Sequence, residues 1–447
     1  MRQHILMPPV TPTMTDGRIA RWHVSEGQHV AAGDVLVEVA TSTATLEIEA
    51  SSEGRVERIL VPAGTEGVKV NTPIAIIFAG VARRAAEAPS AALGFASLEP
   101  LPRDDRSPPA PARAHMPAFA RGTTYREALR DALAEAMHAD DRVFLIGTDV
   151  AQNRGAPKVA QGLLDTFGER RVVRVPALED ALFGVALGAA LSGLRPVVEI
   201  AHWGRALEVL TPYLVTAAET SYLSGGAQSV PLVIRGPNGY VPGMAGQDSR
   251  CIAADLARVS GLKVAQPATA SSAKALLRAA IQDPGPVAVL EHELLYPIQD
   301  LPLGTDAPLD PTPGRARVVR SGADVTIAAV GRAVITALEA AQNLSPDGIE
   351  AEVIDLMWVR PLDRETVAAS VARTGRLLTL EEGVGEGGIG AELIAHVAGH
   401  HLRTLRSPPR RIAGAPVPMP YAGELQALAV PRAVDVVRAV TELVRAP

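Results

Sequence analysis

One glycine-rich segment has the spacing of a nucleotide-binding turn. Gly385, Gly387 and Gly390 match Gly-x-Gly-x-x-Gly and stand between an expected strand and an expected helix. A dinucleotide site also needs an acidic residue about 20 positions later to bind a ribose hydroxyl. The chain has Arg410 and Arg411 in that place. We therefore interpret the segment as a tight connection from strand to helix, and we do not expect an NAD site.

Other groups of reactive residues are also incomplete. Glu291 and Glu293 flank His292, but alternate residues of a strand share one face and no third ligand is apparent, so a metal site is not expected. Ser224 precedes two glycines without the Gly-x-Ser-x-Gly spacing of a hydrolase nucleophile. Cys251 is the only cysteine, which excludes an internal disulfide and any site built from several cysteines.

The composition excludes several broad classes of function. The chain has 447 residues, 47% of them hydrophobic, and a formal net charge of −6, so it can bury more than one core. It offers no basic surface for nucleic acid or for an anionic membrane. The best apolar run, 182–194, is too short to span a bilayer, and the first residues lack a signal-peptide core. We expect a cytoplasmic protein, and the single cysteine fits a reducing compartment.

The segment 35–50 predicts two short strands joined by a tight turn. Apolar residues alternate along both halves, as they do in half-buried strands, and the turn presents Thr43 at its tip. With Leu6-Met-Pro-Pro and Gly64-Thr-Glu-Gly, the segment makes residues 1–80 resemble the lipoyl domains of 2-oxo-acid dehydrogenase complexes. In that family a lysine at the tip carries lipoic acid in an amide linkage. The resemblance implies a small all-β domain, a flattened barrel or sandwich. Because Thr43 has no amine, we expect this domain to carry no covalent lipoate and to be kept for docking or solubility.

Residues 81–118 are rich in alanine, proline, arginine and serine. Such a stretch cannot bury a core, and its prolines keep it extended, so it predicts a semi-rigid linker. At roughly 3 Å per residue, the linker reaches on the order of 100 Å. It is either the tether of a mobile carrier domain or a plain spacer.

From residue 123 onward, helical and strand signals alternate, which is typical of an α/β architecture with largely parallel sheets. Thr123 or Thr124 is a plausible N-cap of the first helix. Residues 300–314 are rich in proline and indicate a second boundary. The expected helices are 123–138, 181–191, 206–221, 271–281 and 431–444, and the expected strands are 143–147, 171–175, 196–200, 231–235, 287–291, 325–330, 352–356 and 376–380.

Three long segments of the second part of the chain are distinctive: Gly188-Ala-Ala-Leu-Ser-Gly-Leu-Arg-Pro, Arg235-Gly-Pro-Asn-Gly and Val417-Pro-Met-Pro-Tyr-Ala. On these and other segments, almost all of residues 122–447 resemble the β subunit of the pyruvate dehydrogenase decarboxylase component. The resemblance implies a transketolase-like domain that binds the pyrimidine of thiamine diphosphate at 119–300, and a transketolase C-terminal domain at 315–447. It also implies an α2β2 heterotetramer with the cofactor at the α/β interface, and contact with the acyltransferase core of the complex.

The resemblance assigns roles to individual residues. Glu179 falls where the family glutamate hydrogen-bonds the pyrimidine ring nitrogen and promotes loss of the thiazolium proton. Without the resemblance, we would interpret it as an acid at the start of a helix. The family's cofactor pocket maps onto Asp149, Glu179, Leu182, Ala201, Trp203 and Arg205. The chain lacks the Gly-Asp-Gly and Asn-Asn sequences that hold magnesium and diphosphate. We therefore expect a partner α subunit to hold the magnesium.

The departures from the family gather in the same pocket. Asp248 replaces a histidine that faces the reacting carbons, and the Phe-x-Phe of the family is Trp203-Gly-Arg205 here. A carboxylate about 4 Å from that of a 2-oxo acid repels it by roughly 4 kcal/mol at an effective dielectric near 20. Trp203 could stack on the cofactor ring. Arg205 could neutralise Asp248, bind an anionic substrate group, or mark a pocket no longer used.

These changes leave two hypotheses of different class. In the first, the chain is a β subunit that is active with an α partner on an altered substrate. In the second, it is a catalytically degenerate paralogue with a structural or regulatory role in such a complex.

Overall fold

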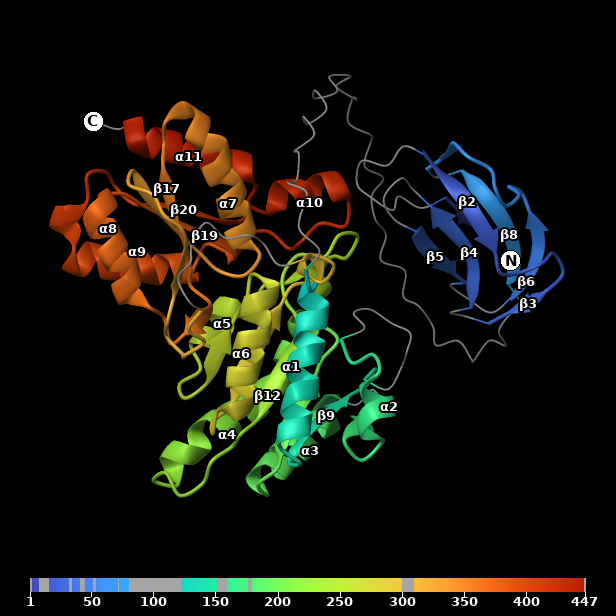
Figure 1. Ribbon diagram of the computed structural model, residues 1–447, viewed down its shortest axis with the longest axis horizontal. Helices are drawn as coiled ribbons and strands as arrows, with labels where there is room; N and C mark the ends of the chain where they lie inside the picture. The colour runs from blue at the N-terminus through green and yellow to red at the C-terminus, as the bar shows by residue number, and fades with distance from the viewer. Residues whose placement is uncertain are drawn as a thin grey trace, which may run out of the picture. The chain divides into compact units, whose positions relative to one another are not determined.

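The computed structural model divides the chain into two compact units, Met1–Pro111 and Ala112–Pro447 (Figure 1). Each unit is considered by itself. The residues that the structure describes are 2–7, 16–31, 34–40, 45–50, 54–70, 72–79, 122–150, 159–175, 179–299 and 309–445. The expected linker, 81–118, lies outside them.

The N-terminal unit consists of two four-stranded antiparallel sheets, in the orders β1-β8-β6-β3 and β5-β4-β2-β7. Its strands are β1 (Arg2–Leu6), β2 (Asp16–Trp22), β3 (His29–Val30), β4 (Val35–Ala40), β5 (Thr45–Glu49), β6 (Gly54–Ile59), β7 (Val68–Lys69) and β8 (Pro73–Ala79). Buried apolar side chains such as Met7, Ile19, Val39 and Ile74 form its core. The predicted hairpin is present as β4 and β5, whereas its tip with Thr43 lies outside the described residues.

The second unit begins with a seven-stranded sheet in the order β10-β9-β11-β12-β14-β13-β18. Its strands are β9 (Val143–Gly147), β10 (Val172–Arg174), β11 (Arg195–Glu199), β12 (Val233–Pro237), β13 (Lys263–Ala265), β14 (Val287–Glu291) and β18 (Trp358–Arg360). All neighbours are parallel except β13 and β18. The central strands β12 and β14 are buried along their whole length, as parallel strands covered on both faces are.

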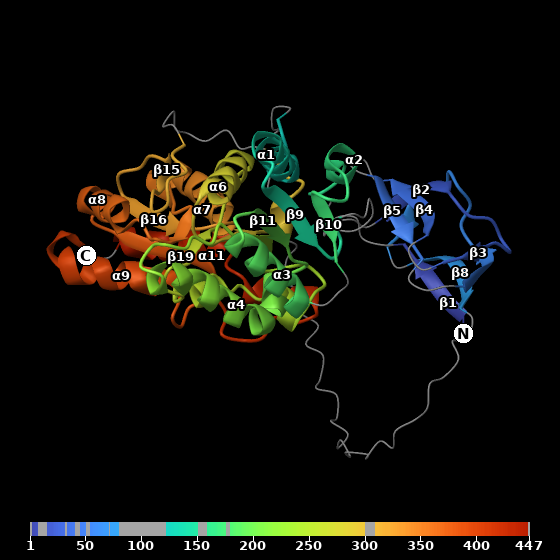
Figure 2. The same cartoon turned by 90° about the horizontal axis from the view of Figure 1, so that it is seen from below.

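Helices cover both faces of this sheet, and Figure 2 shows the two layers. α1 (Tyr125–Ala139) and α6 (Ala270–Gln282) pack together on one face, while α3 (Glu179–Leu191) and α4 (Trp203–Leu223) pack on the other. The short helices α2 (Leu163–Phe167) and α5 (Ala253–Ala257) complete this domain. Thr124 caps α1 with Glu127 in a capping box, which confirms one of the two expected caps.

The C-terminal domain contains a five-stranded sheet in the order β15-β17-β16-β19-β20. Its strands are β15 (Arg317–Arg320), β16 (Val325–Ala329), β17 (Ala351–Asp355), β19 (Leu377–Val384) and β20 (Arg410–Gly414). One face is covered by α7 (Ala333–Leu344) and α11 (Ala433–Arg445), and the other by α8 (Arg364–Thr374) and α9 (Ile389–His400). The short helix α10 (Gly423–Ala429) precedes α11. One apolar cluster continues from this sheet into the first domain, so the two domains share a core.

Several element boundaries differ from the predictions. α4 begins at Trp203 and not at 206, because His202 caps it by accepting a hydrogen bond from the Gly204 N–H at Nδ1. β12 starts two residues later than the predicted strand at 231. Among the described helices, none is long and apolar enough to cross a membrane.

Candidate active site

Polar side chains gather where the parallel strands β11, β12 and β14 end. In parallel sheets the loops that leave the carboxyl ends of the strands are the usual place for ligands. Here β11 leads to His202 and the start of α4, β12 leads to the loop 238–252, and β14 leads to His292. We call the loop 238–252 the Asp248 loop, because it carries Asp248 in its short 3₁₀ helix, Gly246–Ser249.

Arg205 and Asp248 form an ion pair across this edge. The guanidinium donates from Nη2 to Oδ2 of Asp248 at 2.7 Å, and Nε contacts Oδ1, so the two groups meet in a forked geometry. The Arg205 side chain is 56% exposed and the Asp248 side chain is 18% exposed. Of the three expected roles of Arg205, the geometry supports the one in which it neutralises Asp248.

The backbone of Gly204 makes this pairing possible. A Cβ atom added to Gly204 would lie 1.9 Å from the carbonyl oxygen of Gln247. A side chain would therefore push the Asp248 loop away from the first turn of α4. A glycine at 204 allows the loop to approach close enough for Arg205 to reach Asp248.

Trp203 does not have the expected position. Its side chain is fully buried in the core, and its Nε1 donates to the carbonyl oxygen of Val289 at 3.3 Å. No ring face remains open to a ligand in this arrangement. The expected stacking of Trp203 on a cofactor ring is therefore corrected: the residue anchors the start of α4 against β14.

The remaining predicted pocket residues are placed in different environments. α3 begins at Glu179, but the Glu179 side chain lies outside the described residues, so its predicted role stays a prediction. Leu182, one turn along the same helix, is buried. Asp149 and Ala201, after β9 and β11, are exposed. Of the predicted pocket residues, the structure thus brings Arg205 and Asp248 into contact.

His202 belongs to this edge but was not predicted. It is only 5% exposed, and its Nε2 has no hydrogen-bond partner among the described residues. Burial lowers the pKa of His202 to about 4, so the imidazole is neutral at pH 7. The only signal in the sequence is a histidine directly before an amphipathic helix, which is too common to single it out.

A second polar group joins this domain to the C-terminal domain. Glu382 of β19 accepts a hydrogen bond from the Tyr240 N–H and lies 3.0 Å from Nε2 of His292 and 3.4 Å from Nη1 of Arg332. Burial alone would raise the pKa of Glu382, but His292, Arg332 and the Tyr240 N–H together lower it to about 2. Glu382 is therefore a carboxylate that serves as an anchor between domains.

The other candidate segments have structural roles. Arg235 of β12 is fully buried and pairs with Glu199 of β11 and with Glu291 of β14, the neighbouring strands. With Glu291 and His292 both engaged, no group of three or more ligands in the described parts of the chain is arranged to hold a metal ion. The glycine-rich segment ends in α9, where Glu381 accepts the backbone N–H groups of Ile389 and Gly390. This carboxylate fills the place that a phosphate would need.

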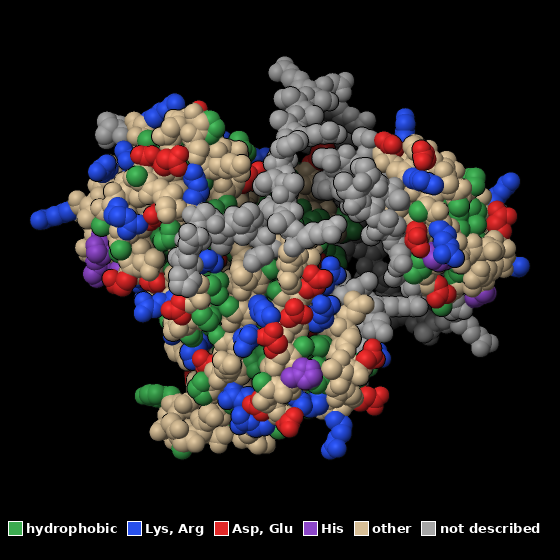
Figure 3. Space-filling view, in the orientation of Figure 1, with side chains coloured by type: hydrophobic (Ala, Val, Ile, Leu, Met, Phe, Trp, Pro, Cys, Tyr) green, Lys and Arg blue, Asp and Glu red, His purple; other side chains and the backbone are tan. Residues whose placement is uncertain are grey.

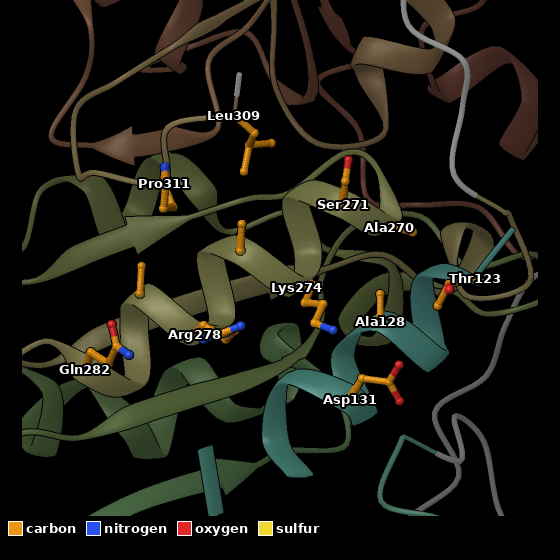
Figure 4. Close-up of a pocket in the computed structure, with 12 residues that line it drawn as sticks. Thr123, Ala128, Asp131, Ala270, Ser271, Lys274, Arg278, Gln282, Leu309 and Pro311 are labelled. Carbon is orange, nitrogen blue, oxygen red and sulfur yellow. The ribbon is translucent and has the colours of Figure 1, made fainter. Parts of the chain in front are cut away.

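A separate hollow lies between α1 and α6, on the face of the first sheet that these two helices cover (Figure 4). It has a volume of about 590 Å³, and Asp131, Lys274 and Arg278 line it. Lys274 and Arg278 are both paired with Glu135, and basic and acidic side chains alternate over this face (Figure 3). We do not assign a ligand to this hollow.

Three family matches account for most of the chain. The family described as "Transketolase, pyrimidine binding domain" matches residues 121–299, and "Transketolase, C-terminal domain" matches residues 314–436. The family described as "Biotin-requiring enzyme" matches residues 3–77. These matches confirm the predicted fold class, including the small β domain at the N-terminus.

The similar proteins include bacterial, plant and animal relatives. The chain is 43% identical to the pyruvate dehydrogenase E1 component subunit beta of Rhizobium meliloti (strain 1021), over 98% of this chain and 99% of the relative. It is 47% identical to the mitochondrial subunit beta-2 of Oryza sativa subsp. japonica, over 73% of this chain and 88% of the relative. A solved structure, "Split gene transketolase, inactive beta4 tetramer", has a TM-score of 0.58 at 24% identity and covers 72% of this chain and 98% of its own, which shows a shared fold.

Proposed function

Because this chain belongs to the family of pyruvate dehydrogenase E1 β subunits, we propose that it works as the β subunit of a thiamine-diphosphate-dependent 2-oxo-acid dehydrogenase. It would decarboxylate a 2-oxo acid at an interface with an α subunit. The observation that carries this proposal is the match to the Rhizobium meliloti subunit over 98% of the chain. The forked Arg205 and Asp248 pair supports it, because that pair removes an uncompensated negative charge from the candidate site.

The chain fits one half of the cofactor. Glu179 begins α3, and the exposed residues Asp149 and Ala201 follow β9 and β11, where these three would hold the pyrimidine side. Leu182 is buried, so we propose that it supports this site from within the core. When bound, thiamine diphosphate supplies a thiazolium carbon that becomes nucleophilic after losing a proton. The proposed role of Glu179 is to share a proton with the nitrogen of the pyrimidine ring. The chain lacks the Gly-Asp-Gly and Asn-Asn sequences for magnesium and diphosphate, so we assign those to the α subunit.

Arg205 and Asp248 would set the charge of the substrate pocket. A lone Asp248 would repel the carboxylate of a 2-oxo acid, but its forked contact with Arg205 makes the pair neutral overall. The pair also occupies the places of a histidine and a phenylalanine in the family. We therefore expect a substrate that differs from pyruvate in the part that meets this pair.

A degenerate paralogue is the second candidate, because a carboxylate held in an ion pair does not provide the hydrogen-bonding of the family histidine. For either candidate we propose an α2β2 heterotetramer, contact with an acyltransferase core and a cytoplasmic location. We place the boundaries at 1–80, 81–118, 119–300 and 315–447. With Thr43 at the hairpin tip, we propose that the N-terminal domain carries no lipoate.

Co-purification with an α subunit tests the proposal. Thiamine diphosphate binding is measured by calorimetry for the chain alone, for the α/β complex, and for the complex with Glu179→Gln. We expect uptake only in the complex and a clear loss of affinity in the variant. Glu219→Gln is the matched control, because Glu219 is an exposed acid on α4. If the complex binds no cofactor, the first candidate is rejected, whereas turnover of any 2-oxo acid rejects the second.

A further inference from the structure

The Asp248 loop is closed at its base by contacts within its own domain. The Asn238 N–H donates to the carbonyl oxygen of Glu291 at 2.8 Å, and the Gly239 N–H donates to the carbonyl oxygen of Arg250 at 3.2 Å. Inside the loop, Oγ of Ser249 accepts the Val241 N–H at 3.0 Å. Oγ of Ser249 also lies 3.2 Å from the carbonyl oxygen of Met244, and the Met244 N–H donates to the carbonyl oxygen of Val241 at 3.1 Å. The N–H groups of Gly243 and Gly246 are held from outside the loop.

The C-terminal domain provides that support. The side chain of Gln426, on α10, is fully buried, and both ends of its amide contact the loop. Oε1 accepts the Gly243 N–H at 3.1 Å, and Nε2 donates to the carbonyl oxygen of Met244 at 2.6 Å. The Gly246 N–H donates to the carbonyl oxygen of Met419 at 3.1 Å. With Glu382 at Tyr240, four successive contacts from one domain hold a loop of the other.

We propose that Gln426 is a positioning residue, which holds the Asp248 loop at the distance where Asp248 meets Arg205. A glutamine amide can satisfy a backbone donor and a backbone acceptor at once, and this combination matches the Gly243 N–H and the Met244 carbonyl oxygen, which Ser249 also contacts. Gly243 has φ +76°, a conformation that residues other than glycine rarely adopt, and its N–H in this turn is directed to Gln426. Three residues after Gly243 begins the 3₁₀ helix that carries Asp248.

The consequence for the reaction rests on the proposed function. If Gln426 positions the loop, its loss should weaken the use of the 2-oxo acid more than the binding of thiamine diphosphate. The charge that faces the substrate would shift while the residues assigned to the cofactor remain in place. In the α/β complex we expect a higher KM for the 2-oxo acid and unchanged cofactor affinity.

Hydrogen exchange tests the positioning role without any need for activity. The full-length chain is compared with Gln426→Leu, which keeps the approximate volume and removes both hydrogen bonds. We expect the Gly243 and Gly246 amides to exchange about tenfold faster, since the two hydrogen bonds from Gln426 to the loop are lost. The Asn238 amide, held within its own domain, should not change. Glu424→Gln on the exposed side of α10 is the matched control and should match the wild type throughout.

Gln426→Glu provides a second test, which also decides the matter if Gln426→Leu fails to fold. The introduced carboxylate accepts the Gly243 N–H but faces the carbonyl oxygen of Met244, so the loop should be less protected at pH 7. Protonation restores a donor, so the difference from wild type should shrink as the pH falls to 5. Unchanged exchange of Gly243 in a folded Gln426→Leu, or no pH-dependent recovery in Gln426→Glu, would overturn the proposal. Neither result depends on catalysis, so both are separate from the fate of the proposed function.

Discussion

The Arg205 and Asp248 pair gives the sharpest prediction about the candidate site. Arg205→Met keeps most of the apolar stem of the side chain and removes the charge. Asp248, which is only 18% exposed, would then stand uncompensated at the carboxyl edge of the sheet. Asp248→Asn removes the carboxylate in turn, and the double variant removes both charges.

The size of the effect follows from distance and exposure. Two unit charges about 4 Å apart interact by about 4 kcal/mol at an effective dielectric near 20. Because the Arg205 side chain is 56% exposed, solvent screens the pair, and pairs of this kind contribute closer to 1 kcal/mol. An approaching 2-oxo acid should meet a penalty between these limits in Arg205→Met. We expect kcat/KM to fall by about tenfold, which corresponds to about 1.4 kcal/mol.

Steady-state turnover of the α/β complex measures this effect. The double variant should recover most of the activity that Arg205→Met loses, and the loss should shrink at high salt. Arg258→Met is the control, because Arg258 forms an exposed ion pair with Asp255 on α5. If the double variant is as slow as Arg205→Met, the uncompensated carboxylate is not the cause. If the complex proves inactive, the same four proteins can be compared in urea unfolding, where the coupling should be about 1 kcal/mol.

Three further predictions concern single groups. Burial raises the pKa of Asp355 to about 7, above the value of 3.8 for the free group. The stability contributed by this carboxyl is therefore present below about pH 4 and is lost as the pH rises through 7. Asp355→Asn keeps an acceptor for the Met357 N–H, so it should raise the melting temperature at pH 8 and not at pH 4. The pKa of Glu382 is lowered from 4.5 to about 2, so its carboxylate contributes stability above pH 4.5 that is lost as the pH falls toward 2. In Glu382→Gln, the free energy of unfolding measured by circular dichroism should therefore fall less steeply between pH 4.5 and pH 2. Thr43→Lys should gain a lipoyl adduct when treated with a lipoate ligase, as intact mass will show, whereas the wild type should gain none; an unmodified variant would mean that more than the lysine has been lost.

Local patterns predicted most of the fold because they depend on neighbouring residues. The apolar run Val143–Gly147 is a buried strand as expected, and Thr124 with Glu127 marks the start of α1. β18 was missed because a strand of three residues has no detectable period. It joins the first sheet only because the chain returns from the C-terminal domain to pair with β13.

The candidate site was predictable where it depends on residue type and not where it depends on distant contacts. The opposite charges at positions 205 and 248 suggested a pair, which the structure contains. Trp203 was misjudged because an aromatic residue suits a core as well as a cofactor pocket, and only the packing decides between them. Gln426 gave no signal at all, since its partner Gly243 is 183 positions away in the sequence.

The buried trio of Arg235, Glu199 and Glu291 has a consequence for how such a subunit can diverge. Arg235 holds one carboxylate on each neighbouring strand, so replacing Arg235 would leave both Glu199 and Glu291 without their cation. Breaking a buried pair of this kind costs about 3–5 kcal/mol, a large part of the stability of a domain. Replacement of Arg235 alone is therefore costly, whereas Arg205 and Asp248 lie at the rim, where replacing one of them costs closer to about 1 kcal/mol of stability. Substitutions at positions 205 and 248 can therefore change the charge of the pocket without breaking the ion pairs inside the sheet that supports it.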